Sequence, residues 1–71
     1  MMNLTVNGEP RESVVTNLTD LWRSETEHLN LDSPKGYAIA LNGALVRKDK
    51  WPNTTLAEGD RVEIVRAMQG G

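Results

Sequence analysis

The sequence predicts an α+β fold in which several strands form a sheet and one helix lies across one of its faces. Three observations predict it: alternating apolar residues near both ends of the chain, two Asn-Gly pairs typical of hairpin turns, and one stretch with helical spacing. A hairpin, a helix and then further strands are typical of a sheet covered by one helical layer. At 71 residues, we expect a single domain over 1–71.

The chain begins with a predicted hairpin. Apolar and polar residues alternate over 2–6, which predicts a strand with one buried face. The Asn7-Gly8 pair that follows is a strong signal for a tight turn. We expect a shorter partner strand over about 11–15, with Pro10 tolerated at its start because no ladder hydrogen bond needs its nitrogen there.

A helix is predicted next. Asn17 is a suitable N-cap, and Asp20 places a negative charge in the first turn, where the helix dipole favours it. Because Pro34 lacks a backbone donor and restricts the residue before it, the helix must end before that position. The apolar side chains at helical spacing, expected to face the sheet, are Leu18, Leu21, Trp22 and Leu29.

The second half repeats the hairpin pattern. Residues 37–41 favour a strand. They are followed by a second turn signal, Asn42-Gly43, and by a short predicted partner strand over 44–46. A polar stretch follows, and we expect it to be an irregular crossing held down by Trp51. The last predicted strand, over 61–67, directs Val62 and Ile64 toward the core.

Composition excludes several classes of function. A net charge of −2 argues against nucleic-acid binding, which needs clustered Lys and Arg. The chain has no cysteine and a single histidine, His28, to which we assign only a favourable position near the helix C-terminus. It has no phosphate-binding loop motif, no metal-ligand spacing and no apolar run that would span a membrane. We therefore expect a soluble cytoplasmic protein that cannot activate a substrate by itself.

The stretch from Leu41 to Gly71 carries a resemblance to a known family. The chain resembles the thiamine-biosynthesis sulfur carrier family (ThiS), which is ubiquitin-like and has the β-grasp fold. This resemblance implies a mixed sheet of four to five strands, one helix across one face, and a flexible C-terminal tail over 67–71. The residues that carry it are Asn42, Gly43, Val46, Arg47, Trp51, Thr55, Leu56, Gly59, Asp60, Val62, Glu63, Ile64, Gly70 and Gly71.

The resemblance implies that the chain end is the working group. The Gly71 carboxylate would be adenylated with ATP by a ThiF-like adenylyltransferase, and sulfur from a donor protein such as a cysteine desulfurase would convert it to a thiocarboxylate. Thiazole synthase, ThiG-like, would then receive the sulfur. The chain itself would bind no cofactor and would be a co-substrate, not an enzyme.

Partner enzymes must reach this end of the chain. Gly70 and Gly71 have no Cβ, so they fit a narrow channel and adopt backbone angles closed to other residues. Met68 and Gln69 are expected to belong to the same extended tail and to be recognised mainly through their backbone. We hypothesise that Val65 and Arg66, on the last strand, contact the partner. Val65 alternates in step with Arg61 and Glu63, so its side chain is expected to point away from the core. Trp22, in contrast, is assigned to the core.

Two other interpretations of the function remain open. The small subunit of molybdopterin synthase and a ubiquitin-related modifier would share the fold and the Gly-Gly end but would serve other acceptors. In a different class, a β-grasp interaction module would carry its two glycines without using them.

Overall fold

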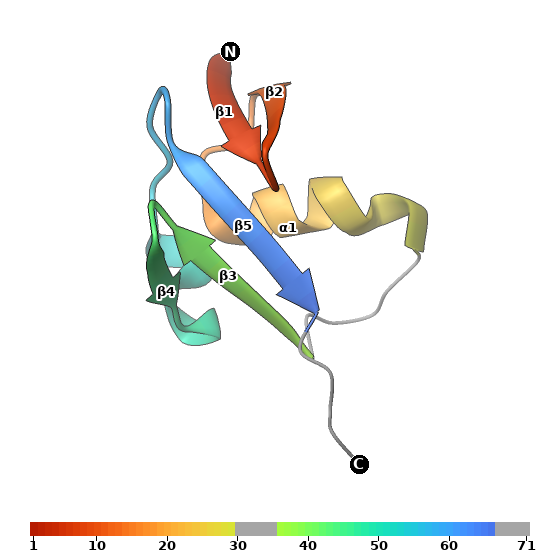
Figure 1. The fold of residues 1–71 in the computed structure, drawn as a ribbon. Coiled ribbons are helices and arrows are strands. Elements are labelled where there is room, and N and C mark those ends of the chain that lie inside the picture. Colours follow the sequence, from red (N-terminus) through yellow and green to blue (C-terminus); the bar gives the residue numbers. More distant parts are fainter. Residues whose placement is uncertain (30–35, 67–71) are drawn as a thin grey trace.

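A computed structural model describes residues 1–29 and 36–66 and shows a five-stranded sheet with one helix against one face (Figure 1). Its strands lie in the order β2-β1-β5-β3-β4. Only β1 and β5 run parallel, so the sheet is mixed, as expected. The elements are β1 Met2–Val6, β2 Glu9–Ser13, α1 Leu18–Thr26, η1 Glu27–Leu29, β3 Tyr37–Leu41, β4 Ala44–Val46, η2 Lys48–Asn53 and β5 Arg61–Arg66.

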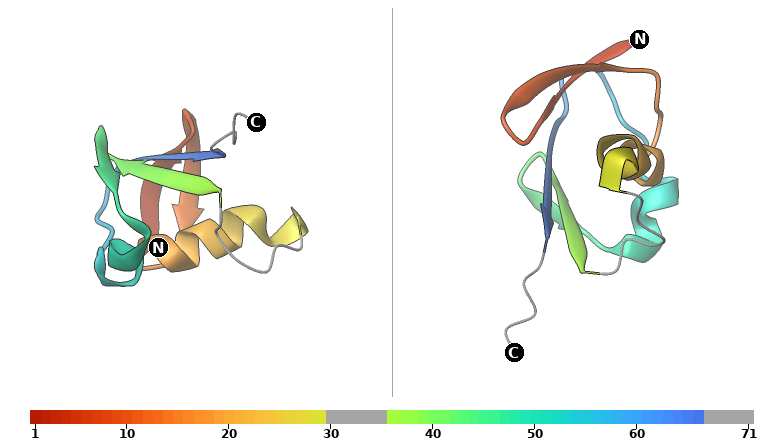
Figure 2. Two further views of the ribbon diagram at one scale, coloured as in Figure 1. Left: turned by 90° about the horizontal axis from the view of Figure 1, so that it is seen from below. Right: turned by 90° about the vertical axis from the view of Figure 1, so that its right-hand side faces the viewer.

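The hydrophobic core lies between the sheet and the layer formed by α1 and η2, which cover the same face (Figure 2). Inward side chains of β1, β3 and β5 meet the apolar stripe of the helix there. The opposite face of the sheet carries no helix among the described residues (Figure 2). The buried core residues are Leu4, Val6, Leu18, Leu21, Trp22, Ile39, Trp51, Leu56 and Val62.

The first hairpin is tighter than predicted. We expected its second strand over 11–15, but β2 runs from Glu9 to Ser13, directly after the two-residue turn. The physical reason is the turn itself, because a two-residue loop pairs Val6 with Glu9 and leaves no room for a longer connection. Pro10 consequently lies inside β2, at the edge of the sheet, where a missing donor is tolerated.

The helix starts as predicted and ends before Pro34, also as predicted, but its last turn differs. The backbone N of Asp20 donates to Asn17 Oδ1 at 2.9 Å, which confirms the N-cap. After Thr26 the chain tightens into the 3₁₀ segment η1, and this changes the direction of the side chains that follow, since a 3₁₀ turn has fewer residues than an α turn. The prediction that Leu29 is buried was therefore wrong: it is 48% exposed, and Thr26 is buried instead. The loop expected before Pro34 lies outside the described residues.

Trp51 holds the crossing segment to the core, as predicted. The segment is the 3₁₀ helix η2, which is more regular than expected, and the Trp51 indole is only 1% exposed. Its Nε1 donates to the carbonyl oxygen of Val46 at 3.0 Å, so the indole also fixes the end of β4. The ring lies 6.4 Å from that of Trp22, centroid to centroid. The two indoles thus lie next to each other in the core.

Replacing Trp51 with Phe tests this anchor. The variant Trp51→Phe keeps a ring in the core but removes the indole N–H that donates to the Val46 carbonyl and leaves part of the site empty. We expect unfolding free energy to fall by about 1–3 kcal/mol, measured by urea denaturation. Val14→Ala, at a side chain that is 77% exposed, is the control and should change stability by less than about 0.5 kcal/mol. Equal stability of Trp51→Phe and the wild type would contradict this role.

Candidate partner-binding site

The strand β5 lies at the centre of the sheet and leads to the last residues of the sequence. It pairs with β3 along its length, from Leu41 opposite Val62 to Tyr37 opposite Arg66. Its pairing with β1 is much shorter and involves only Arg61 and Val62. Figure 1 shows the end of β5 projecting past the hairpin formed by β1 and β2. The part of β5 nearest the tail is therefore supported from one side only.

The two Asn-Gly turns hold β5 from both sides. Asn7 and Asn42 each have a φ of 52°, the left-handed conformation that this kind of turn requires. Their side chains accept hydrogen bonds from β5: Asn42 Oδ1 from the backbone N of Arg61, and Asn7 Oδ1 from that of Ile64, both at 2.8 Å. We call this pair of side chains the clamp. Sequence analysis identified both residues as turn signals but did not predict their contacts with β5.

The turn before β5 is also fixed by side chains. Asp60 accepts from Asn42 Nδ2 at 3.0 Å and from the backbone N of Ala57 at 2.8 Å. Glu58 accepts from the backbone N and from Nδ2 of Asn3, both at 2.9 Å. These bonds, the backbone one first, lower the pKa of the Glu58 carboxyl below its ordinary value of 4.5. The start of β5 is thus tied to both β1 and the second turn.

The face of the sheet turned away from α1 carries an apolar stripe near the end of β5. Val65 is 52% exposed, which confirms its predicted outward direction. It lies opposite Ala38 on β3, and the next outward residue of β3, Ala40, lies opposite Leu45 of β4, which is 73% exposed. Residues paired across strands share a face, so these four side chains form one patch, which we call the outer stripe. The exposed Glu63, opposite Ala40 on the same face, borders it. Sequence analysis found only Val65, because the stripe is assembled from three strands.

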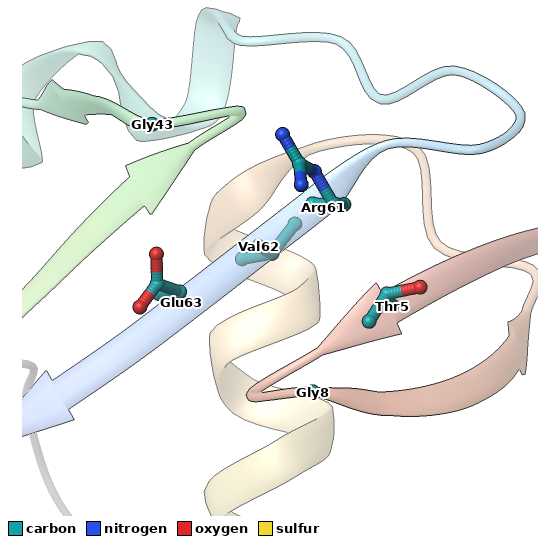
Figure 3. A pocket seen from close by; sticks show the side chains of 6 residues that line it. All are labelled: Thr5, Gly8, Gly43, Arg61, Val62 and Glu63. Carbon is teal, nitrogen blue, oxygen red and sulfur yellow. The ribbon is translucent and has the colours of Figure 1, made fainter.

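A shallow hollow of about 300 Å³ lies beside the stripe, between the two Asn-Gly turns (Figure 3). Thr5 comes from β1, while Arg61 and Glu63 come from β5 and carry opposite charges. The sequence contained no signal for this hollow, because its walls come from both hairpins. The residues that line it are Thr5, Gly8, Gly43, Arg61, Val62 and Glu63.

The predicted site residues fall into two groups. Val65 and Arg66 are both exposed at the end of β5. Met68, Gln69, Gly70 and Gly71 lie outside the described residues. Within residues 1–29 and 36–66, no group of three metal-ligating side chains comes together. No helix in that part of the chain is long and apolar enough to cross a membrane.

Comparisons with known proteins place these features in a family context. The model of the ThiS family matches residues 4–71. A crystal structure of the thiamine biosynthesis protein ThiS from Geobacter metallireducens is similar, with a TM-score of 0.75 and 33% identity, over 99% of this chain and all of that one. A solution structure of a thiamine biosynthesis protein from the same organism gives a TM-score of 0.68 at 33% identity, over 99% of this chain and 88% of that one. The search of curated proteins found no match.

The clamp can be tested at Asn42. Asn42→Ala leaves the Arg61 N–H without its acceptor and replaces asparagine, which tolerates the φ of 52°, with a residue that tolerates it less well, so we expect a loss of about 1–3 kcal/mol in unfolding free energy. Asn42→Gly removes the same hydrogen bonds but relieves the backbone strain, and should cost about 1 kcal/mol. Urea denaturation measures both. An alanine variant as stable as the wild type would show that the clamp contributes nothing.

Proposed function

This chain belongs to the ThiS family, the sulfur carriers of thiamine biosynthesis, and we propose that the carboxylate of Gly71 carries the sulfur as a thiocarboxylate. The observation that supports this most strongly is that the family match extends through Gly70 and Gly71. The match also favours the thiamine carriers over the molybdopterin-synthase subunit and the ubiquitin-related modifier. The chain would act as a co-substrate that is activated by a separate enzyme.

The chemistry needs an activated acyl group. A carboxylate, ionised at neutral pH, is a poor acyl donor because its leaving group would be an oxide or hydroxide. In the proposed reaction, an oxygen of the Gly71 carboxylate attacks the α-phosphorus of ATP, and pyrophosphate leaves. A sulfur nucleophile then attacks the acyl carbon, and AMP leaves with the electron pair of the anhydride bond. Where this nucleophile is the outer sulfur of a donor persulfide, the product is an acyl disulfide; a second thiol then attacks the donor's sulfur, so that a disulfide forms and the Gly71 thiocarboxylate leaves with the electron pair of the S–S bond.

Each step of the proposed reaction needs a partner protein. A ThiF-like adenylyltransferase binds the ATP, and a protein such as a cysteine desulfurase supplies the sulfur. Thiazole synthase, ThiG-like, takes the sulfur into the thiazole ring. Because the activating cosubstrate is ATP, the proposal places the carrier in the cytoplasm. The glycines at the end let the tail enter a narrow active site, with Met68 and Gln69 recognised through their backbone.

The body of the protein presents the tail to these enzymes. The clamp and the pairing with β3 fix the direction of β5 as far as Arg66. The outer stripe lies on the same strand, next to that residue. An enzyme that draws the tail into its active site must approach this end of β5. We therefore propose that Val65 and Arg66 contact the adenylyltransferase, with Ala38 and Leu45 continuing the apolar surface.

Intact-mass analysis tests the chemistry. After incubation with ATP, the adenylyltransferase and a sulfur source, we expect a mass gain equal to the exchange of one oxygen for sulfur, located on Gly71. Deletion of Gly71 should abolish the gain completely while the thermal unfolding temperature stays unchanged. If the deleted form acquired sulfur as the full chain does, the proposal would be wrong.

A second test concerns the surface. Val65→Asp places a charge in the outer stripe, and burying that charge against an apolar partner is costly. We expect binding to the adenylyltransferase to weaken by about ten- to a hundredfold, measured by calorimetry. Val14→Asp is a matched control, because Val14 is also exposed but follows β2 and lies outside the stripe. Equal binding by the two variants would exclude Val65 from the interface.

A further inference from the structure

The two sides of β5 use alternate residues for hydrogen bonding. On the side of β3, Arg61 exchanges bonds with Asn42: its carbonyl accepts from the Asn42 backbone N at 2.7 Å, and its own N donates to Asn42 Oδ1. On the side of β1, the carbonyl of Val62 accepts from the backbone N of Asn7 at 2.9 Å, and Ile64 N donates to Asn7 Oδ1. Since the alternation continues along a strand, Arg66 also directs its N–H and C=O toward the side of β1.

The ladder between β1 and β5 stops before β5 does. Its last residue pair is Val6 with Val62, after which the chain turns away at Asn7. The Asn7 side chain then adds one further bond by offering Oδ1 to the N–H of Ile64, where a continuing strand would offer a backbone carbonyl. Beyond this bond, within the described residues, no strand lies opposite the Ile64 carbonyl and the Arg66 N–H. We call this segment, Ile64–Arg66, the open edge.

The open edge has weaker protection against pairing than the outer strand β2. Exposed strand edges pair readily with other chains, so proteins shorten them or place proline and charges along them. Here β2 carries Pro10 and charged residues, and β4 is only three residues long. The open edge is also three residues long and ends at the charged Arg66, but it contains no proline, and its middle residue, Val65, has an exposed apolar side chain in the outer stripe. It is also continuous with the tail, because Ala67 follows it directly in the sequence.

We propose that an extended segment of the activating enzyme adds to this open edge as a sixth strand beside β5. The enzyme segment accepts a hydrogen bond from the Arg66 N–H and donates one to the Ile64 carbonyl, as in other cases of strand addition. The inference rests on the proposed function, since it names the enzyme that handles the tail. Its consequence is that backbone hydrogen bonds align the chain just before the tail enters the active site, whatever the side chains of the tail are.

The position of the open edge favours the activating enzyme as its binding partner. A protein that binds the residues directly after Arg66 lies next to the open edge, because the two form one continuous backbone. A second copy of this chain is a poorer fit. Pairing through a three-residue segment buries much less than the roughly 1,200–2,000 Å² of a stable interface, and it would cover the tails of both copies.

The experiment removes one backbone donor without changing a side chain. A chain of this length is accessible to chemical synthesis, so the amide of Arg66 can be N-methylated. Because that N–H has no partner among the described residues, the methylated protein should unfold at the same temperature as the unmodified one. Binding to the adenylyltransferase should weaken by about tenfold or more, through the lost hydrogen bond and the clash of the methyl group with the added strand.

Amide hydrogen exchange gives a second measurement on unmodified protein. In the free chain, we expect the Arg66 amide to exchange fast and that of Val65, which faces β3, to exchange slowly. Saturation with the enzyme should slow exchange at Arg66 by at least about tenfold and leave Val65 unchanged. The Val65 amide thus serves as a control within the same strand.

The outcomes separate the two proposals. If unmodified protein is adenylated, but N-methylation leaves binding unchanged and the enzyme does not slow exchange of the Arg66 amide in the unmodified chain, the open edge is not a docking site and the proposed function stands. If the unmodified chain is neither bound nor adenylated, both proposals are wrong. Protection of the Arg66 amide without enzyme, together with a dimer in light scattering, would assign the open edge to a second copy and overturn the inference.

Discussion

The structure depends on how β5 is held. This strand must lie at the centre of the sheet to fold with the core, yet its end must stay clear to lead into the tail. Hydrogen bonds from its backbone to Asn7 and Asn42 meet both needs, because they grip the first part of the strand and leave the last part paired with β3 alone. The two turns are therefore both hairpin connections and supports for the strand that carries the tail.

The position of the core explains why the opposite face is available. With 71 residues and no cysteine, the protein concentrates its apolar side chains on one side, where two indoles and the helix stripe fill the space under the sheet. A domain of this size has too few residues to cover both faces of its sheet. The outer stripe thus remains exposed beside the end of β5, and a surface left open by folding becomes available for docking.

In the proposed function, the folded part of the protein carries out no chemical step itself. The reactive group is the carboxylate of Gly71, and the ATP and the sulfur come from partners, so the folded part has to present the tail in a fixed direction. The outer stripe and the open edge lie on the same strand, immediately before the tail. Under the two proposals, one approaching enzyme would contact side chains on the sheet face, backbone on the strand edge and then the tail itself, in that order along the chain.

Signals carried by neighbouring residues determined much of this protein: the strand order along the chain, both Asn-Gly turns, the Asn17 cap and the outward direction of Val65. Turn angles, caps and alternation depend on residues close in sequence, so they can be read from it. Local patterns misplaced β2 and Leu29, where turn length and a tightened helix end decided the outcome. Only the tertiary structure decided the clamp, the outer stripe, the hollow and the open edge, because each needs strands from distant parts of the chain and their register is fixed only when the core packs.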